Sequence, residues 1–322
     1  HLIPIANKPI LQYAMDYAKE AGITEIGIIV NAVSDGIREY FGDGSSQGLK
    51  ITYIPQDAPL GLAHCVKIAE DFIGKDKFIF YLGDNMIVGG IKKFIDEFEQ
   101  SDANCFLTLA KVKDPQRFVV PEIKDGKIVG VEEKPELPKS DFAVTGIYLY
   151  DSSIFEAVNN IQPSARGELE ISDAHQYLID KNFTVKYTEI TGWWKDTGKP
   201  SDLLAANRLI LDNINDEIYG EVDNYSVVVG NNHIGKNSKI INSIIRGPVV
   251  IGENCSIINS FIGPHTSIGD NTTVNSSEIE YSIILNDCLI KELNIRLETS
   301  ILGNDVQIVS AHGKPRVNKF MI

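Results

Sequence analysis

The chain has 322 residues, 43% of them hydrophobic and 23% charged, which are the proportions of a folded globular protein whose length favours two domains. The formal net charge of -14 and the absence of a dense Lys/Arg run disfavour nucleic acid and anionic membrane surfaces as partners. No apolar stretch approaches the roughly 20 residues that a membrane-spanning helix needs. We therefore expect a cytoplasmic protein that binds neither nucleic acid nor a membrane.

The four cysteines stand far apart among apolar residues, without the paired spacing of a zinc site or the density of a disulfide scaffold. Buried free thiols in a reducing compartment are the expected state. The histidines are equally dispersed, and none of them stands in a metal-ligand spacing. We assign them no chemistry.

The first part of the chain alternates helical and strand-like segments. The expected elements are a helix over 9–22, strands over 26–30 and 51–54, a helix over 61–72 and a strand over 78–82. Such alternation favours an open, mainly parallel sheet with helices on both faces. In that architecture, ligands bind at the carboxyl ends of the strands.

A second group of strands continues this first domain. The expected elements are strands over 105–112 and 142–150 around a hairpin that turns at Asp125–Gly126, a helix over 168–179, a strand over 183–189 and a closing helix over 201–213. We predict that the first domain covers residues 1–219.

After Gly220, apolar residues recur every five or six positions, a period that fits neither a helix nor a simple hairpin. Glycine follows many of these apolar residues, and Asn and Ser stand where corners are expected. The pattern is typical of hexapeptide repeats that stack into a β-helix, and a β-sandwich with chance spacing is the alternative. We predict that residues 220–322 form a β-helix that mediates homo-oligomer assembly.

The stretch from Gln56 to His64 joins an expected strand to an expected helix. Its Gly61 would let backbone N–H groups approach a flat or phosphorylated ligand at the helix start. A plain connecting loop would have much the same sequence.

Two aspartates stand where separate loops are expected to converge. Asp84 directly follows a buried strand, and Asp196 lies in a turn that contains Gly198. Two such carboxylates could hold one Mg²⁺ ion and leave coordination positions open for phosphate oxygens. Aspartate in a glycine turn is also a common turn former, and that alternative stays open.

Glu133 and Lys134 end an expected strand, and Pro135 fixes the bend that follows. Lys134 can then project toward an anion, and Glu133 can accept hydrogen bonds from hydroxyl groups. A solvated charge cluster is the alternative interpretation.

Arg166 precedes an expected helix and could bind phosphate through two hydrogen bonds, or it could simply pair with Glu168 or Glu170. Trp193 and Trp194 either belong to the core or form a wall against a sugar ring.

Taken together, these segments resemble the glucose-1-phosphate thymidylyltransferases, especially the longer form with a C-terminal left-handed β-helix. Seven motifs carry the resemblance in chain order: Leu2–Pro9, Gln56–Ala63, Leu82–Asn85, Glu133–Pro135, Val144–Tyr148, Arg166–Glu170 and Trp194–Gly198. The resemblance implies an α/β nucleotidyltransferase domain with a Rossmann-like open mixed sheet, followed by a left-handed parallel β-helix.

The resemblance also implies roles for individual residues. Gln56, Gly61 and Asp84 would bind the nucleotide; Asp84 and Asp196 would bind Mg²⁺; Glu133, Val144, Gly146 and Tyr148 would lie along the sugar; and Lys134 and Arg166 would hold the sugar phosphate. The implied catalytic residues are Asp84, Lys134 and Asp196.

The implied reaction is in-line attack by a sugar 1-phosphate, by default glucose 1-phosphate, on the α-phosphorus of a nucleoside triphosphate, by default dTTP. It yields a nucleotide sugar and pyrophosphate through positioning and charge neutralisation, without a covalent enzyme intermediate.

Two departures from the family pattern bear on these expectations. The family's Gly-rich triphosphate loop is absent, so we expect it to precede His1, and we expect a further coil after Ile322. Val119 stands where the family usually has glycine, which leaves the identity of the sugar open. The alternatives are a UTP-dependent uridylyltransferase, including a bifunctional acetylating form, and a non-catalytic regulatory protein that binds sugar nucleotides.

Overall fold

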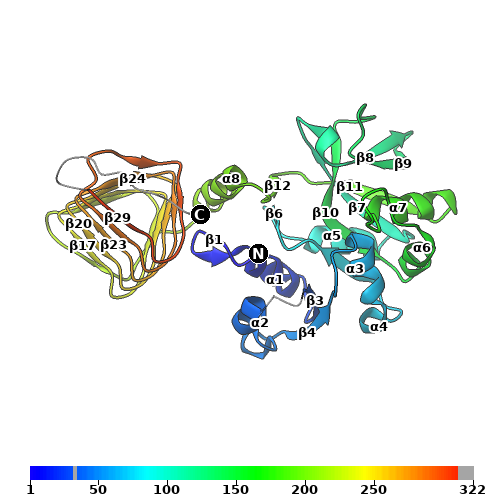
Figure 1. Ribbon diagram of the computed structural model, residues 1–322, viewed down its shortest axis with the longest axis horizontal. Coiled ribbons are helices and arrows are strands. Elements are labelled where there is room, and N and C mark those ends of the chain that lie inside the picture. Colours follow the sequence, from blue (N-terminus) through cyan, green and yellow to red (C-terminus); the bar gives the residue numbers. More distant parts are fainter. Residues whose placement is uncertain (32–34, 311–322) are drawn as a thin grey trace. The chain divides into compact units, whose positions relative to one another are not determined.

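The computed structural model describes residues 1–31 and 35–310, which form two compact units. The first unit contains His1–Leu2 and Ile10–Asp196, and the second contains Ile3–Pro9 and the chain from Thr197 onward. Figure 1 shows the mixed α/β layers of the first and the stacked coils of the second. No helix in the described ranges combines the length and apolar character that a membrane span requires.

A six-stranded sheet forms the centre of the first unit. Its strands are β5 (Phe78–Tyr81), β7 (Cys105–Lys111), β8 (Val119–Lys124), β9 (Lys127–Glu133), β10 (Phe142–Tyr150) and β11 (Val185–Glu189). The order is β11-β7-β10-β8-β9, with β5 also paired to β10. β11 and β7 run parallel, whereas β10 runs antiparallel to β5, β7 and β8. The sheet is therefore mixed, which confirms the mixed sheet implied by the resemblance. The expectation of mainly parallel strands, drawn from the alternation alone, is wrong because β10 and the β8–β9 hairpin pair antiparallel.

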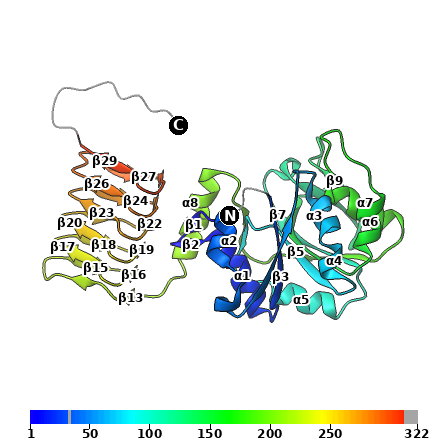
Figure 2. The ribbon, with the colours of Figure 1, turned by 60° about the horizontal axis from the view of Figure 1, so that its bottom comes forward.

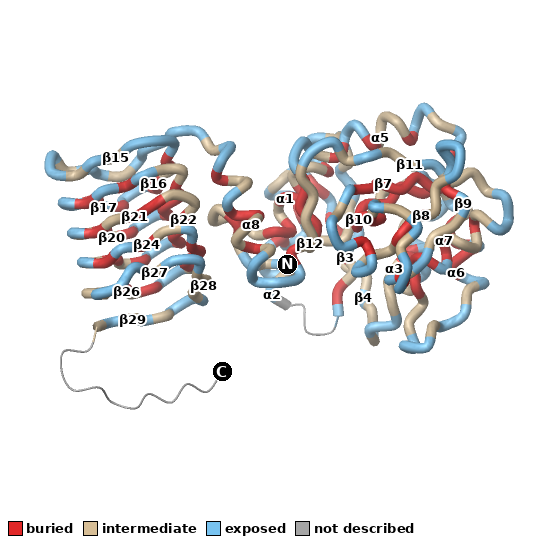
Figure 3. The backbone as a smooth tube through the Cα atoms, turned by 90° about the horizontal axis from the view of Figure 1, so that it is seen from above, coloured by how far each residue is buried: buried red, intermediate tan, exposed pale blue. Residues whose placement is uncertain are grey.

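Helices cover both faces of this sheet, as expected from the sequence (Figure 3). They are α3 (Leu62–Ile68), α4 (Glu70–Ile73), α5 (Lys92–Glu99), α6 (Ile154–Asn160) and α7 (Ile171–Asp180). Because side chains alternate along a strand, Leu107 of β7 packs into the cluster with α3, α6 and α7. Its neighbour Phe106 packs with Phe94 and Phe98 of α5 on the opposite face.

A smaller parallel pair, β3 (Glu25–Val30) and β4 (Lys50–Pro55), packs beside α1 (Ile10–Glu20) and α2 (Asp35–Phe41). Short 3-10 turns occupy Ser45–Gln47 and Pro115–Arg117. Buried side chains of α1 recur at helical spacing, which explains why this segment is a helix. Pro9, expected to open α1, instead ends the preceding hairpin.

The second unit is a parallel β-helix with three strands in each full coil, and Figure 2 shows the coils stacked. The first sheet contains β13 (Glu217–Ile218), β16 (Asn232–Ile234), β19 (Val249–Ile251), β22 (Thr266–Ile268), β25 (Ile283–Ile284) and β28 (Ile301–Leu302). The second contains β14 (Glu221–Val222), β17 (Lys239–Ile241), β20 (Ser256–Ile258), β23 (Thr273–Asn275), β26 (Leu289–Lys291) and β29 (Gln307–Val309). The third contains β15 (Val227–Val229), β18 (Ile244–Arg246), β21 (Phe261–Ile262), β24 (Glu278–Glu280) and β27 (Leu297–Glu298).

The periodicity of the sequence becomes a set of ladders inside this β-helix. Ile240, Ile257, Val274 and Ile290 stack in register and are all completely buried. At one corner Asn237 donates a 3.2 Å hydrogen bond to Asn254, 17 residues later. These corner asparagines have positive φ angles, a conformation that asparagine tolerates better than most residues. The predicted β-helix with asparagine corners is confirmed up to residue 310; residues 311–322, which the prediction also included, lie outside the described residues.

The compact units divide the chain at a different place from the predicted boundary after residue 219. The helix α8 (Pro200–Leu211) and the hairpin of β1 (Pro4–Ile5) and β2 (Lys8–Pro9) belong to the β-helix unit. Hydrogen bonds contribute to this division, because Asn207 of α8 bonds both the hairpin and the β-helix.

Candidate active site

A pocket with a volume of about 310 Å³ lies in the first unit, lined in part by residues of β8, β9 and β10 of the central sheet. Eight of the ten residues predicted to form the site line it, and Val119 does as well. The eight are Asp84, Glu133, Lys134, Val144, Gly146, Tyr148, Arg166 and Asp196. These residues are far apart in the sequence, so the fold itself brings them together.

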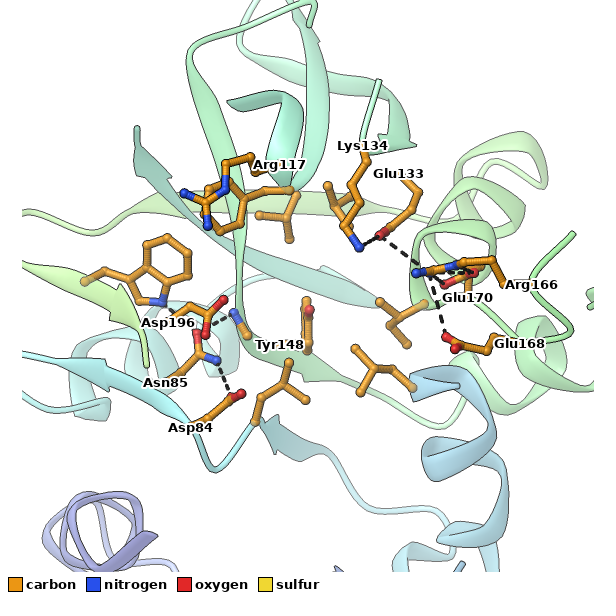
Figure 4. A pocket seen from close by; sticks show the side chains of 18 residues that line it. Asp84, Asn85, Arg117, Glu133, Lys134, Tyr148, Arg166, Glu168, Glu170 and Asp196 are labelled. Carbon is orange, nitrogen blue, oxygen red and sulfur yellow. Dashed lines mark hydrogen bonds and ion pairs between the residues drawn. The ribbon is translucent and has the colours of Figure 1, made fainter. Parts of the chain in front are cut away.

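The two aspartates come from the ends of two paired strands. β6 (Asn85–Ile87) and β12 (Trp194–Asp196) run antiparallel, and Asp196 lies opposite Asn85 in the register. Asp84 immediately precedes β6, so strand pairing brings both carboxylates to one edge of the pocket. In Figure 4, Asn85 lies between Asp84 and Asp196.

Asn85, which the sequence interpretation did not single out, connects three parts of the site. Its side-chain Nδ2 donates a 2.9 Å hydrogen bond to Oδ1 of Asp84. Its Oδ1 accepts hydrogen bonds from the backbone N–H of Gly146 at 3.1 Å and from Nε1 of Trp194 at 2.7 Å. The Asn85 side chain is buried, so its three bonds define its orientation.

Gly146 has a specific structural reason to be glycine. A Cβ atom at this position would lie 2.5 Å from Nδ2 of Asn85, a distance that real Cβ contacts do not reach. The bare backbone therefore allows Asn85 to approach and to bind the N–H of Gly146. Trp194 also lines the pocket, and its ring meets that of Phe118 edge-on at 5.6 Å between centroids.

Part of the pocket lining is apolar. Val119 pairs with Val144 across β8 and β10, and both side chains line the pocket. Tyr148 is buried, its ring is stacked on Phe80 at 5.9 Å between centroids, and burial raises the pKa of its phenol. The phenol therefore stays protonated at physiological pH and can donate a hydrogen bond.

Lys134 and Glu133 reach the pocket from the end of β9 (Figure 4). Lys134 has a φ of 45°, and its N–H donates a 2.9 Å hydrogen bond to the carbonyl of Phe118. The ammonium lies 3.2 Å from Oε1 of Glu133, and the Lys134 side chain is 52% exposed. The two residues thus form a charge pair, as in the alternative interpretation, but that pair lines the pocket.

Arg166 is held in place by Glu170. Its Nη2 lies 2.8 and 2.9 Å from the two carboxylate oxygens of Glu170, and its Nε lies 3.1 Å from Oε1. Hydrogen bonding to Glu170 raises the pKa of Arg166, with smaller contributions from Glu168 and Glu133. The predicted alternative of an Arg166–Glu170 pair is confirmed, and the paired guanidinium still lines the pocket.

The family model described as nucleotidyl transferase matches residues 1–213. This chain belongs to the nucleotidyl transferase family. It is 44% identical to the glucose-1-phosphate thymidylyltransferase of Streptomyces griseus, over 100% of this chain and 90% of that relative. The glucose-1-phosphate thymidylyltransferase of Streptomyces antibioticus is 43% identical at the same coverage.

Solved structures of other proteins agree on the fold of this nucleotidyl transferase. A Bacillus anthracis protein assigned as a glucose-1-phosphate thymidylyltransferase, in complex with sucrose, matches with a TM-score of 0.63 and 38% identity. The match covers 67% of this chain and 88% of that one. A UDP-glucose pyrophosphorylase complexed with UDP-glucose shares the fold at a TM-score of 0.59 and 22% identity, over 66% of this chain and 89% of that one.

Nucleotidyl transferases of this kind use a divalent metal ion, and the charges of the pocket fit one. Five carboxylates but only three cationic side chains line it: Asp84, Glu133, Glu168, Glu170 and Asp196 against Arg117, Lys134 and Arg166. Among the described residues, no three His, Cys, Asp or Glu side chains cluster as a ready-made metal site. Two aspartates alone leave coordination positions for phosphate oxygens and water, as Mg²⁺ sites with bound nucleotides do.

Gln56 and Gly61 do not line this pocket. Nε2 of Gln56 lies 3.1 Å from Nδ1 of His64. Gly61 has a φ of 99°, and a Cβ there would lie 2.4 Å from the carbonyl oxygen of Leu169. The close approach of two chain segments therefore explains this glycine, whereas a role for either residue in binding the base stays a prediction.

Arg117 and Glu170 are two further charged residues of the site that were not predicted as functional residues. Both line the pocket, Arg117 from the turn before β8 and Glu170 from the start of α7. Their sequence signals were present, because Arg117 precedes the Val119 position by two residues and Glu170 ends the Arg166 motif. A single sequence could not show that either side chain faces the pocket.

Proposed function

We propose that this enzyme converts glucose 1-phosphate and dTTP to dTDP-glucose and pyrophosphate. The observation that carries the proposal is the convergence of two aspartates and two cations, Lys134 and Arg166, on one pocket that is also lined by the apolar side chains of Val119 and Val144. The full-length similarity to two glucose-1-phosphate thymidylyltransferases supports the choice of substrates. The UTP-dependent and regulatory alternatives are not favoured by these relatives.

In the proposed reaction, a phosphate oxygen of the sugar 1-phosphate attacks the α-phosphorus of the triphosphate. The bond between the α-phosphorus and its bridging oxygen breaks, and pyrophosphate leaves with that oxygen and its charge. Lys134 and Arg166 would orient the attacking phosphate, and Glu133 would accept hydrogen bonds from sugar hydroxyl groups. Positioning and charge neutralisation would supply most of the acceleration.

Asp84 and Asp196 would hold a Mg²⁺ ion, which supplies positive charge where two phosphorylated substrates meet. The carboxylate excess in the pocket supports this assignment, because phosphates could not enter it without a counterion. Asn85 would fix the Asp84 carboxylate through its 2.9 Å hydrogen bond.

The proposal is tested by pyrophosphate release from purified protein incubated with a matrix of nucleoside triphosphates and sugar 1-phosphates. The expected maximum of kcat/KM is at dTTP with glucose 1-phosphate. A maximum of kcat/KM at UTP would instead identify the enzyme as a uridylyltransferase. Binding of dTDP-glucose without turnover of any pair would instead support a regulatory protein.

Two further assignments accompany this proposal. The β-helix is proposed to mediate homo-oligomer assembly, supported by eight exposed large hydrophobic residues in its first coils: Ile218, Tyr219, Val222, Tyr225, Val227, Val229, Ile241 and Ile244. A cytoplasmic location is supported by four cysteines that are all free thiols.

A further inference from the structure

The chain passes between the two compact units at three peptide bonds, and these crossings matter for the candidate site. They are Leu2–Ile3, Pro9–Ile10 and Asp196–Thr197. The third crossing follows the last residue of β12, which is one of the two aspartates. The second immediately precedes α1. The start of α1 and the end of β12 are therefore covalently continuous with the β-helix unit.

Helix α1 is itself bonded to the other strand of the site. The hydroxyl of Tyr17 in α1 donates a 2.8 Å hydrogen bond to the carbonyl oxygen of Ile87 on β6. β6 begins at Asn85 and pairs with β12. β6 is thus bonded to α1, which follows directly from the second unit, and β12 itself continues directly into that unit.

A cluster of hydrogen bonds within the second unit, here called the joint, fastens the β1–β2 hairpin and α8 to one corner of the β-helix. Its centre is Asn207 of α8, which is completely buried. Oδ1 of Asn207 accepts hydrogen bonds from the N–H of Ala6 at 2.8 Å and from Oγ of Ser267 at 2.6 Å. Its Nδ2 donates a 3.1 Å hydrogen bond to the carbonyl of His265. One amide therefore links three segments.

Two further hydrogen bonds reach the same corner. Nδ2 of Asn7, in the hairpin, donates to the carbonyl of Ile268 at 2.6 Å. Nε2 of His265 lies 2.7 Å from Oδ1 of Asp212, the residue that caps the end of α8. The hairpin is attached to residues 265–268 once directly and once through Asn207, and the helix with its cap is attached to them three times.

The conformation of the hairpin shows why such an attachment is needed. Its two turn residues, Ala6 and Asn7, have φ angles of 48° and 60°, in the left-handed region. Two-residue hairpins of this kind favour Asn-Gly, because alanine is strained at positive φ. This turn has Ala-Asn instead, so hydrogen bonds from outside the hairpin must hold it.

We propose that the joint positions the candidate active site, so that the β-helix is a structural part of the catalytic apparatus. By holding the hairpin and α8 on one coil, it fixes the start of α1, which is bonded to β6, and the segment that leaves β12. Asn207 is a positioning residue that touches no substrate. The kinetic part of the test rests on the proposed thymidylyl transfer, whereas the exchange part is independent of it.

The test uses the full chain with Asn207→Ala, Asn7→Ala and the control Asn232→Ala. Asn232 is also a completely buried asparagine of the second unit, but its Nδ2 donates only to the carbonyls of Val229 and Gly230, within its own coil. Backbone hydrogen exchange is measured over residues 5–8, 85–88 and 194–196, followed by kcat and KM for both substrates.

For Asn207→Ala we expect exchange over residues 5–8 to rise about tenfold, the size of effect that one buried hydrogen bond supports. Exchange at the ends of β6 and β12 should rise by a smaller factor. kcat should fall roughly three- to tenfold while both KM values stay within about twofold, because substrate contacts are retained. Asn7→Ala should act in the same direction but less. Asn232→Ala should lower the melting temperature without these changes.

Three results would overturn the proposal. One is unchanged exchange over residues 5–8 in Asn207→Ala, and another is the same response from Asn232→Ala. The third is raised exchange in the hairpin with unaltered exchange in β6 and β12, because the site would then be positioned without the joint. If Asn207→Ala does not fold, Asn7→Ala, which is only half-buried, decides by the same readings. A wild-type protein without transferase activity would count against the proposed function, and exchange would still decide the joint.

Discussion

Asparagine side chains make individual contacts in the pocket but repeated contacts in the β-helix. In the pocket, Asn85 makes three hydrogen bonds to three different partners, which lie in three separate segments of the chain. In the β-helix, Asn237, Asn254 and Asn271 make the same contact from coil to coil. A repeated contact can be weakened once and still be supported by its neighbours. The comparison implies that pocket substitutions change turnover, whereas substitutions in the repeated ladders of the β-helix, away from the joint, change stability.

The largest expected effect is the loss of either aspartate. Asp84→Asn or Asp196→Asn preserves shape but removes charge from a site that needs a cation, so kcat should fall on the order of 10²-fold or more. KM for the sugar phosphate should change far less. The measurement is kcat against Mg²⁺ concentration, together with thermal unfolding. Near-normal turnover with unchanged metal dependence would refute a shared ion and leave both residues as turn formers.

A smaller effect, roughly tenfold on kcat, is expected for Asn85→Asp. The new carboxylate still accepts from Gly146 and Trp194, but it faces the Asp84 carboxylate instead of donating to it. The altered contact between residues 84 and 85 is measured by the NMR signal of the Trp194 indole N–H in isotopically labelled protein and by the apparent Mg²⁺ affinity.

Asn104→Asp is the matched control for this substitution. Asn104 also donates from Nδ2 to an aspartate, Asp151 at 2.8 Å, and accepts a backbone N–H from Thr184 at 2.9 Å. It lies outside the residues that line the pocket. We expect a comparable loss of stability without loss of turnover, and equal kinetic effects from the two variants would argue that Asn85 acts only through folding.

In the β-helix, Ile257→Val should lower the free energy of unfolding by about 1 kcal/mol, the usual cost of one buried methyl group. Ile257 is completely buried between Ile240 and Val274. Turnover per folded molecule should stay unchanged. Chemical denaturation measures the free energy of unfolding, and steady-state kinetics on the same preparation measure turnover. A large kinetic effect would contradict the difference proposed between the pocket and the β-helix.

The smallest effect is expected at Val119, which lines the pocket beside Val144. Val119→Gly should raise kcat/KM for bulkier sugar phosphates by roughly two- to tenfold, the range typical of one apolar group in a pocket. A panel of sugar 1-phosphates with a fixed triphosphate measures it. Identical constants across the panel would show that Val119 does not limit sugar choice.

Much of the fold could be predicted because it depends on local pattern. The β-helix follows from apolar residues at regular spacing and from corner asparagines, since each coil contacts only its neighbours. The helices 61–72 and 168–179 and the strand 142–150 were expected from periodicity, and elements occur at each of them. The direction of β10 was not, because β10 is buried along nearly its whole length and so lacks the one-sided alternation typical of many antiparallel strands.

The sequence by itself determined the class of this protein: seven ordered motifs, two kinds of periodicity and the candidate charges of the site. Only the tertiary structure decided which groups meet. The register of β6 with β12 places Asp196 opposite Asn85. Because Gly146 has no side chain, the Asn85 amide can lie close to its backbone. The tertiary structure also places α8 in the β-helix unit, where Asn207 forms its hydrogen bonds. Hydrogen bonds between residues 60 or more positions apart leave no periodic trace, so a single sequence cannot reveal them.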